Sequence, residues 1–153
     1  MPYIGAYWGN RPQTLDECAS SLIVFLTNLK KYNEELFGNW FEQGMSKKAA
    51  LSKPVEIDRE VLSKLISKKK KGFEYPDTNY RLSLWNGAKS DDFGIVLRIS
   101  LGGGDTRFCL NSCLLEFGEN DVYNSLFSNI LSLGELKKVI NKIWAPDNVK
   151  INE

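Results

Sequence analysis

The apolar positions near the N-terminus change from a strand-like to a helical spacing. Residues 3–8 form a short apolar run that predicts a strand. Apolar side chains then recur at three- and four-residue steps, which places them on one face of a helix over about residues 15–31. Thr14 and Glu17 are the two halves of a capping box, so this helix is expected to begin directly after Thr14. Arg11 is expected to anchor the turn between strand and helix.

A second helix is expected after Pro54, because the proline ring prevents a helix from continuing through it. Asp58 is the expected N-cap. The run Lys68–Lys71 precedes Gly72 and falls at the predicted C-terminus, where cations complement the helix dipole. The buried stripe of this helix is expected to consist of Val61, Leu62, Leu65 and Ile66.

The middle third of the chain alternates apolar and polar residues and predicts three strands. The segments "YRLSLW" (80–85) and "IVLRISL" (95–101) each place their leucines and isoleucines on a single face. The following "GGGD" permits a tight reversal, after which "FCLNSCLLEF" (108–117) returns as the third strand. These segments predict an antiparallel meander with one solvent-facing side.

The last forty residues return to a helical spacing. A weak apolar stripe is expected from Val122 to Leu131, including Leu126 and Ile130, and a stronger helix over residues 133–144. Ser132 and Glu135 form a second capping box for the stronger helix. A proline then stops this helix, and "VKI" is expected to add a terminal strand.

Helices and strands that occur in blocks predict an α+β fold. We expect a single domain in which an antiparallel sheet, a meander, is packed by several helices. A chain of 153 residues is long enough to bury one sizeable core. The residues expected in that core are Leu22, Leu26, Leu97, Ile99, Leu115, Leu136 and Ile140.

Composition limits the partners and the compartment. The 20 lysines and arginines balance 19 aspartates and glutamates, and this formal charge of +1 provides no overall field toward nucleic acid or an acidic membrane. The chain shows neither a membrane-spanning run nor a signal peptide, so a cytoplasmic location is expected. Three cysteines without a two-residue spacing, Cys18, Cys109 and Cys113, fit reduced thiols better than disulfides or a zinc site.

No residue constellation typical of catalysis is found. The chain contains no histidine, which removes the commonest general acid and base and the commonest metal ligand. The acidic pairs Asp91–Asp92 and Glu119–Asp121 fall in turn-rich stretches, where solvated carboxylates are common. The "GGGD" segment lacks the lysine and the following helix of a phosphate-binding loop. We therefore expect no enzyme activity, no cofactor and no metal.

Two surface features leave binding functions open. The four tryptophans stand in short polar contexts, which suits the edge of a core or a binding surface. Lysines 68 to 71, together with Phe73 and Tyr75, are compatible with a solvated helix end. They also allow an alternative function, a small nucleic-acid-binding module that uses charge and base stacking.

Five short motifs occur in a fixed order over almost the whole chain: "YWGNR…TLDECA", "WFEQGMSKKAAL", "LSLWNG", "LNSCLLEF" and "IWAPDN". In this order they resemble the Immunity protein 52 family. The resemblance implies that residues 1–153 form a single immunity-protein domain of a bacterial polymorphic toxin system. Such a protein binds and neutralises a cognate toxin effector, in this family commonly a restriction-endonuclease-like nuclease. Delivery of the toxin by type VI secretion and a cytoplasmic inhibitor are typical of this setting.

The resemblance supplies no contact residues, so candidates follow from electrostatics. A nuclease presents a cationic groove to hold phosphate, and an inhibitor in that groove benefits from carboxylates. The aromatic surface around Trp40 and Trp85 is the alternative contact region. The acidic loop residues expected to contact the toxin first are Glu34, Glu35, Asp91, Asp92, Glu119 and Asp121.

Overall fold

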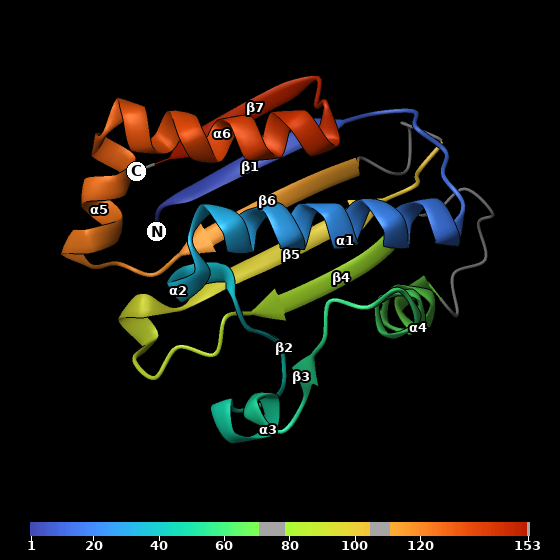
Figure 1. The fold of residues 1–153 in the computed structure, drawn as a ribbon, viewed down its shortest axis with the longest axis horizontal. Helices are drawn as coiled ribbons and strands as arrows, with labels where there is room; N and C mark the ends of the chain where they lie inside the picture. The colour runs from blue at the N-terminus through green and yellow to red at the C-terminus, as the bar shows by residue number, and fades with distance from the viewer. Residues whose placement is uncertain (71–78, 105–110, 153) are drawn as a thin grey trace.

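The computed structural model describes residues 1–70, 79–104 and 111–152 (Figure 1). The α-helices within these ranges are α1 (Leu15–Tyr32), α2 (Glu34–Phe37), α3 (Lys47–Leu51), α4 (Arg59–Lys70), α5 (Asp121–Ser128) and α6 (Ile130–Trp144). A 3-10 turn, η1, spans Asp91–Phe93. The strands are β1 (Tyr3–Trp8), β2 (Trp40–Glu42), β3 (Pro54–Val55), β4 (Tyr80–Trp85), β5 (Ile95–Leu101), β6 (Asn111–Phe117) and β7 (Asn148–Asn152).

These strands form one sheet in the order β3-β2-β4-β5-β6-β1-β7, and every neighbouring pair is antiparallel. The predicted meander β4-β5-β6 lies at its centre, where Leu84 pairs with Leu97 and Leu97 with Leu115. The predicted first and last strands, β1 and β7, extend the sheet on one side. The α+β fold with an antiparallel sheet is confirmed.

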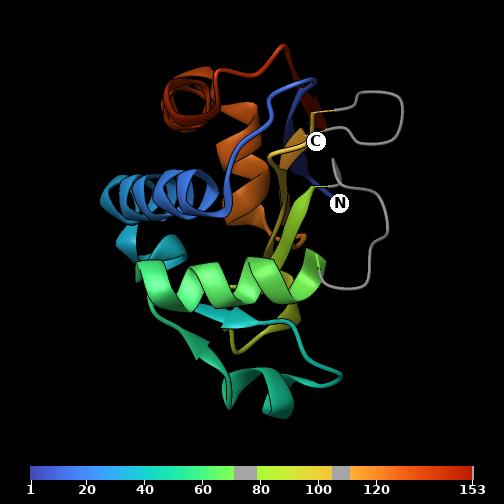
Figure 2. The ribbon, with the colours of Figure 1, turned by 90° about the vertical axis from the view of Figure 1, so that its right-hand side faces the viewer.

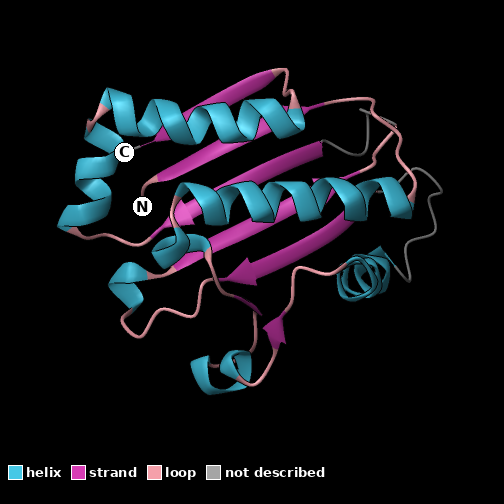
Figure 3. Cartoon of the chain, in the orientation of Figure 1, coloured by secondary structure: helices cyan, strands magenta, loops and turns pink. Residues whose placement is uncertain are grey.

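The helices are concentrated on one face of the sheet. Figure 2 shows the sheet nearly edge-on with α1 and α6 on the same side, whereas α4 runs from that side to the edge of the sheet. Figure 3 shows α1 and α6 lying over the strands in a similar direction. Burial alternates accordingly: Leu97 and Ile99 of β5 are buried, whereas Arg98 between them is exposed. Within the described chain the opposite face is open, except at the corner where α3 lies near Trp85. The predicted solvent-facing side of the meander is confirmed.

The core lies between this sheet and the helical layer. Helix α1 contributes six buried residues and contacts both α4 and α6. The seven predicted core residues are all at most 3% exposed, which confirms the assignment of apolar faces: Leu22, Leu26, Leu97, Ile99, Leu115, Leu136 and Ile140.

Two of the predicted helix starts are confirmed by their caps. The Thr14 hydroxyl accepts from the Glu17 N–H at 3.2 Å, and Glu17 Oε1 accepts from the Thr14 N–H at 2.9 Å. Asp58 Oδ2 accepts from the N–H of Val61 at 3.1 Å and so caps α4. Both helices therefore begin where a side-chain oxygen satisfies a free backbone donor.

The predicted start of the last helix is wrong. Helix α6 begins at Ile130, and its N-cap is Asn129, whose Oδ1 accepts from the N–H groups of Leu131 at 3.0 Å and Ser132 at 3.2 Å. Ser132 is therefore already helical, and no capping box forms with Glu135. Asn129 is also the C-cap of α5, so a single residue joins the two helices.

The apolar stripe predicted for residues 122–131 is wrong as well. Helix α5 buries Tyr123 and Phe127, whereas Val122 is exposed. The helix ends at Ser128, and because α6 starts in a new direction, Ile130 and Leu131 do not continue the α5 face. The spacing that suggested one stripe combines residues from two helices.

Arg11 anchors a different element from the one predicted. Its Nη1 donates to the carbonyl of Trp144 and its Nη2 to the carbonyl of Ala145 at 2.9 Å. These are free carbonyls at the C-terminus of α6, which cationic donors stabilise. The Asp147 N–H also donates to the carbonyl of Tyr7 at 2.9 Å. The segment after β1 is thereby bound to the end of the last helix.

A buried amide pair holds the glycine-rich segment that directly follows β5. Asn79 Nδ2 donates to Asn111 Oδ1 at 2.7 Å, and the Asn111 side chain exchanges hydrogen bonds with the backbone of Gly103 at 2.8 and 3.0 Å. Gly102 adopts a positive φ of 77°, which favours glycine. The predicted tight reversal itself is not tested, because residues 105–110, with Asp105 and Cys109, lie outside the described residues.

Candidate functional site

Six exposed acidic residues from three separate segments lie at one end of the molecule, which we call the acidic end. They are Glu34 and Glu35 on α2, Asp91 and Asp92 on η1, and Glu119 and Asp121 at the start of α5. Figure 1 shows α2, α5 and the yellow turn of η1 together on the left side of the sheet. The structure therefore brings all six acidic candidates into one region.

Backbone contacts fix η1 against the start of α5. Asn120 Nδ2 donates to the carbonyl of Asp92 at 2.7 Å, and the Gly118 N–H donates to the carbonyl of Gly94 at 2.8 Å. The approach is so close that a Cβ on Gly118 would lie 2.2 Å from the Asp92 carbonyl oxygen. Only glycine fits this position without movement of the backbone.

The buried side chain of Tyr123 contacts η1 and so supports the acidic end. Its hydroxyl donates to the carbonyl of Phe93 at 2.9 Å, and its ring packs against Phe93 and Phe117 with centroids 5.6 and 5.3 Å apart. Burial, and secondarily the negative charge of Glu35, raises the pKa of Tyr123 to about 12. This phenol therefore stays protonated and acts as a structural donor. The sequence carries no signal for this role of Tyr123, because only the capping residue Asn120 marks the helix start.

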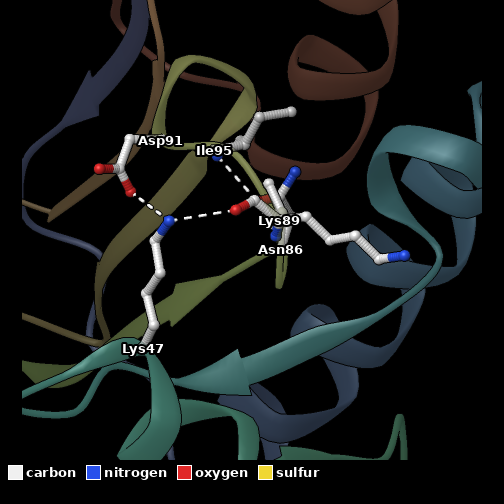
Figure 4. A network of polar contacts seen from close by, with 6 residues as sticks. Lys47, Asn86, Lys89, Asp91 and Ile95 are labelled. Carbon is white, nitrogen blue, oxygen red and sulfur yellow. Dashed lines mark hydrogen bonds and ion pairs between the residues drawn. The ribbon is translucent and has the colours of Figure 1, made fainter.

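A lysine from α3 holds the other side of η1 (Figure 4). Lys47 Nζ lies 2.7 Å from Asp91 Oδ1 and donates to the carbonyl of Lys89 at 3.2 Å. Asn86 Oδ1 accepts from the Ile95 N–H at 2.9 Å and closes the base of the loop. The backbone of the loop is thus fixed at several points.

The acidic end keeps part of its charge. Three of its carboxylates are partnered by Lys30, by Lys47 and by the α-amino group of Met1, with N···O distances of 3.9, 2.7 and 3.1 Å. Such exposed pairs contribute about 0–1 kcal/mol each and are easily exchanged for other partners. Among the described residues, no ion pair involves the other three: Glu35, Asp92 and Asp121.

The two aromatic candidates do not form one surface. Trp40 is 2% exposed and stacks on Phe37 in the core, with centroids 6.2 Å apart. Trp85 is half-buried beside Phe41, its cross-strand neighbour, on the open face of the sheet. Trp40 and Phe41 are consecutive on β2 and so point to opposite faces of the sheet. Because Trp85 packs beside Phe41, it lies on the face opposite to Trp40. Trp40 offers no contact surface, and Trp85 remains a candidate.

A cavity of about 310 Å³ connects Trp85 with the acidic end. Its walls include Trp85, Val96 and Ala50, and Lys47 and Asp91 line it as well. The walls of the cavity are therefore mainly apolar, and the charges of Lys47 and Asp91 neutralise each other. It adds a hollow to the edge of the candidate surface.

The described residues show no constellation suited to catalysis or metal binding. No group of three His, Cys, Asp or Glu side chains in these ranges is arranged to hold a metal ion. Cys18 and Cys113 are buried, and burial raises the pKa of Cys113 and so disfavours the reactive thiolate. Of the proposed nucleic-acid patch, Lys71, Phe73 and Tyr75 lie outside the described residues, as do the side chains of lysines 68 to 70. That alternative stays a prediction.

Comparison with known proteins identifies the family. The family model of Immunity protein 52 matches residues 1–149, nearly the whole chain. The chain belongs to the Immunity protein 52 family. No curated protein matches it. Membership of an immunity family places this chain among proteins that protect against toxins.

Several motifs that carry the likeness to Immunity protein 52 lie in the framework of the fold. Trp8 of "YWGNR" and Trp144 of "IWAPDN" are both buried, and their rings stack. Asn111 of "LNSCLLEF" binds the backbone of Gly103. The acidic end draws its residues mainly from the segments between these motifs.

No helix in the described part of the chain is long and apolar enough to cross a membrane.

Proposed function

We propose that this Immunity protein 52 chain neutralises a cognate bacterial toxin by binding it stoichiometrically, as a single unit over residues 1–153, and without catalysis of its own. Family membership supports the toxin partner. The observation that carries the choice of surface is the convergence of six carboxylates on one well-fixed end of the fold. A well-fixed backbone favours binding because little of its conformational entropy is lost on association.

The proposed target is a nuclease domain delivered by type VI secretion, and the proposed place of inhibition is the bacterial cytoplasm. A nuclease groove is lined with cationic groups that neutralise phosphates. Glu35, Asp92 and Asp121, which form no ion pair with another described residue, are complementary to such a groove. Complementary charge accelerates association and excludes wrong partners. Trp85 and the adjoining cavity extend the proposed contact region toward the open sheet face.

Co-expression with the toxin encoded next to this chain tests the proposal. We expect cells that produce both proteins to survive, a 1:1 complex to purify by size-exclusion chromatography, and the isolated toxin domain to lose nuclease activity when this protein is added in equimolar amount. Inhibition that saturates at one equivalent distinguishes binding from catalytic inactivation of the toxin, which a small fraction of an equivalent would complete. Cell death together with the absence of a complex would refute the proposed function.

A further inference from the structure

The junction of α5 and α6 exposes an unusual apolar corner beside the acidic end. Ile130 and Leu131 are 87% and 82% exposed, and Val122 on α5 is 58% exposed. Single exposed apolar residues are common on protein surfaces, but two consecutive branched side chains exposed to this degree are not explained by the packing of the core. We call these three residues the apolar corner.

The corner is rigidly presented. The Asn129 side chain accepts from both Leu131 and Ser132, which fixes the first turn of α6. The carbonyl of Ser132 in turn accepts from the Tyr32 hydroxyl of α1 at 3.3 Å. A shallow hollow lies at the junction, lined by Ser125, Ser128, Asn129, Ile130 and Leu131. Ile130 and Leu131 therefore project from a well-fixed backbone at the edge of a depression.

Helix α5 links the corner to the acidic end. Val122 directly follows Asp121, and α5 connects this acidic start with Ile130 at its far end. Residues 119–134 contain two acidic residues and neither lysine nor arginine. An apolar patch beside exposed carboxylates has the composition of a protein-binding surface, with anchoring side chains near charged residues that set orientation.

We propose that Val122, Ile130 and Leu131 are the apolar anchors of the toxin-binding surface. The inference rests on the proposed function and deepens it. The occupant is the cognate toxin domain, through a surface in which basic residues surround an apolar depression. Charge complementarity selects this occupant, because the basic groove of a nuclease matches the carboxylates next to the corner. The carboxylates steer the encounter, and burial of the aliphatic side chains lengthens the lifetime of the complex.

A second copy of this chain is the competing occupant. Pairing of two corners around a two-fold axis would bring like charges together, since each corner carries the acidic start of α5 beside it. Repulsion between those carboxylates disfavours this arrangement, most strongly at low salt. The toxin, with opposite charge, meets no such penalty.

The double variant Ile130→Ser/Leu131→Ser tests the inference, with Val24→Ser as the matched control. Val24 is an exposed aliphatic residue on the outer side of α1. Affinity for the neighbour-encoded toxin domain is measured by titration calorimetry and surface plasmon resonance. We expect the double variant to bind at least about tenfold more weakly, mainly through faster dissociation. Val24→Ser should bind like the unmodified protein, and the thermal midpoints of both variants should stay close to it.

The outcomes separate the two proposals. If the unmodified protein binds the toxin and the double variant binds equally well, the apolar corner is not part of the interface and the inference is overturned, while the proposed function stands. If the unmodified protein does not bind the toxin, the proposed function itself fails. Sedimentation velocity tests for self-association. If the unmodified protein forms a dimer and the double variant does not, the corner serves self-association and the inference is overturned.

Discussion

The indole rings of Trp8 and Trp144 stack with centroids 5.5 Å apart and an interplanar angle of 15°. Trp8 ends the first strand of the chain and Trp144 ends its last helix. The Arg11 guanidinium lies 5.3 Å from the centroid of Trp8, and its amino groups bind the carbonyls that end α6. This arrangement joins the two ends of the domain through contacts that neither segment can make alone.

Replacement of Trp144 by Ala should destabilise the protein by about 3–5 kcal/mol, because a large aromatic side chain is removed from a packed core. Trp144 is 2% exposed and contacts Phe25 as well as Trp8, with ring centroids 5.2 Å apart for the Phe25 pair. Urea unfolding followed by far-ultraviolet circular dichroism measures the effect without relying on tryptophan fluorescence. A loss below about 1 kcal/mol would contradict the stacked arrangement.

Replacement of Leu26 or Ile99 by Ala should cost about 2–5 kcal/mol, because each leaves a cavity between helix α1 and the sheet. Both side chains are buried, Leu26 completely. Val24→Ala on the exposed side of α1 is the matched control and should stay within about 0.5 kcal/mol of the unmodified protein. Equal effects at Leu26 and Val24 in chemical denaturation would show that the helix face is assigned wrongly.

The period of apolar residues predicts most elements of the fold because each long element buries one face. Helix α1 and strands β4 and β5 follow this rule throughout, and their bounds agree closely with the expected ones. The rule fails where a short helix meets another at a single residue. At Asn129 the chain changes direction, so Val122 and Ile130 share a spacing but lie on different helices.

The acidic candidates could be named from the sequence, but their convergence could not be predicted. Glu34, Asp92 and Asp121 come from distant segments, and only the strand order β4-β5-β6 with α2 at the same end brings those segments together. The contacts that fix them depend on Gly118 and Tyr123, whose roles have no local signal. The separation of Trp40 from Trp85 likewise depends on which face each strand residue takes.

Replacement of Gly118 by Ala should disturb η1 and α5 together. The added Cβ would meet the Asp92 carbonyl oxygen at 2.2 Å, so the backbone has to shift. We expect a loss of about 1–3 kcal/mol in the free energy of unfolding, the usual range for overpacking. Hydrogen exchange should show loss of protection at Tyr123, whose N–H donates to the Asn120 side chain, whereas amides of α1 should keep theirs. Gly134→Ala is the control, because its Cβ would meet no atom within 4 Å.

Tyr123→Phe should change the response of stability to alkaline pH. The folded protein raises the pKa of Tyr123 from 10.0 to about 12. Between these values the unfolded chain releases the phenol proton and the folded protein retains it, so the stability of the unmodified protein falls as pH rises from 10 to 12. The variant lacks this contribution and should lose less stability over the same interval. Burial also raises the pKa of Tyr7 and Tyr32, but these groups are common to both proteins and cancel in the comparison.

At neutral pH the same variant should be less stable than the unmodified protein by about 1 kcal/mol, because the Phe93 carbonyl loses its hydrogen bond. The difference between the free energies of unfolding of the two proteins should therefore become smaller as pH rises above 10. Parallel pH profiles would show that the Tyr123 phenol titrates normally in the folded protein, which would contradict its burial beneath η1.

Charge reversal at the acidic end should weaken toxin binding if this surface faces a cationic groove. The three segments are reversed separately: Glu34 with Glu35, Asp91 with Asp92, and Glu119 with Asp121. We expect each reversal that reaches the interface to slow association and to cost about 1 kcal/mol or more in binding free energy, with the loss reduced at high salt because ions screen exposed charges.

Asp91 also pairs with Lys47, so Asp92→Lys alone separates the loss of recognition from a change in loop structure. Glu60→Lys on α4, away from the acidic end, is the matched control; its exposed pair with Lys64 contributes little. Unchanged affinity and unchanged salt dependence for all three segments would move the proposed interface to Trp85 and the open face of the sheet.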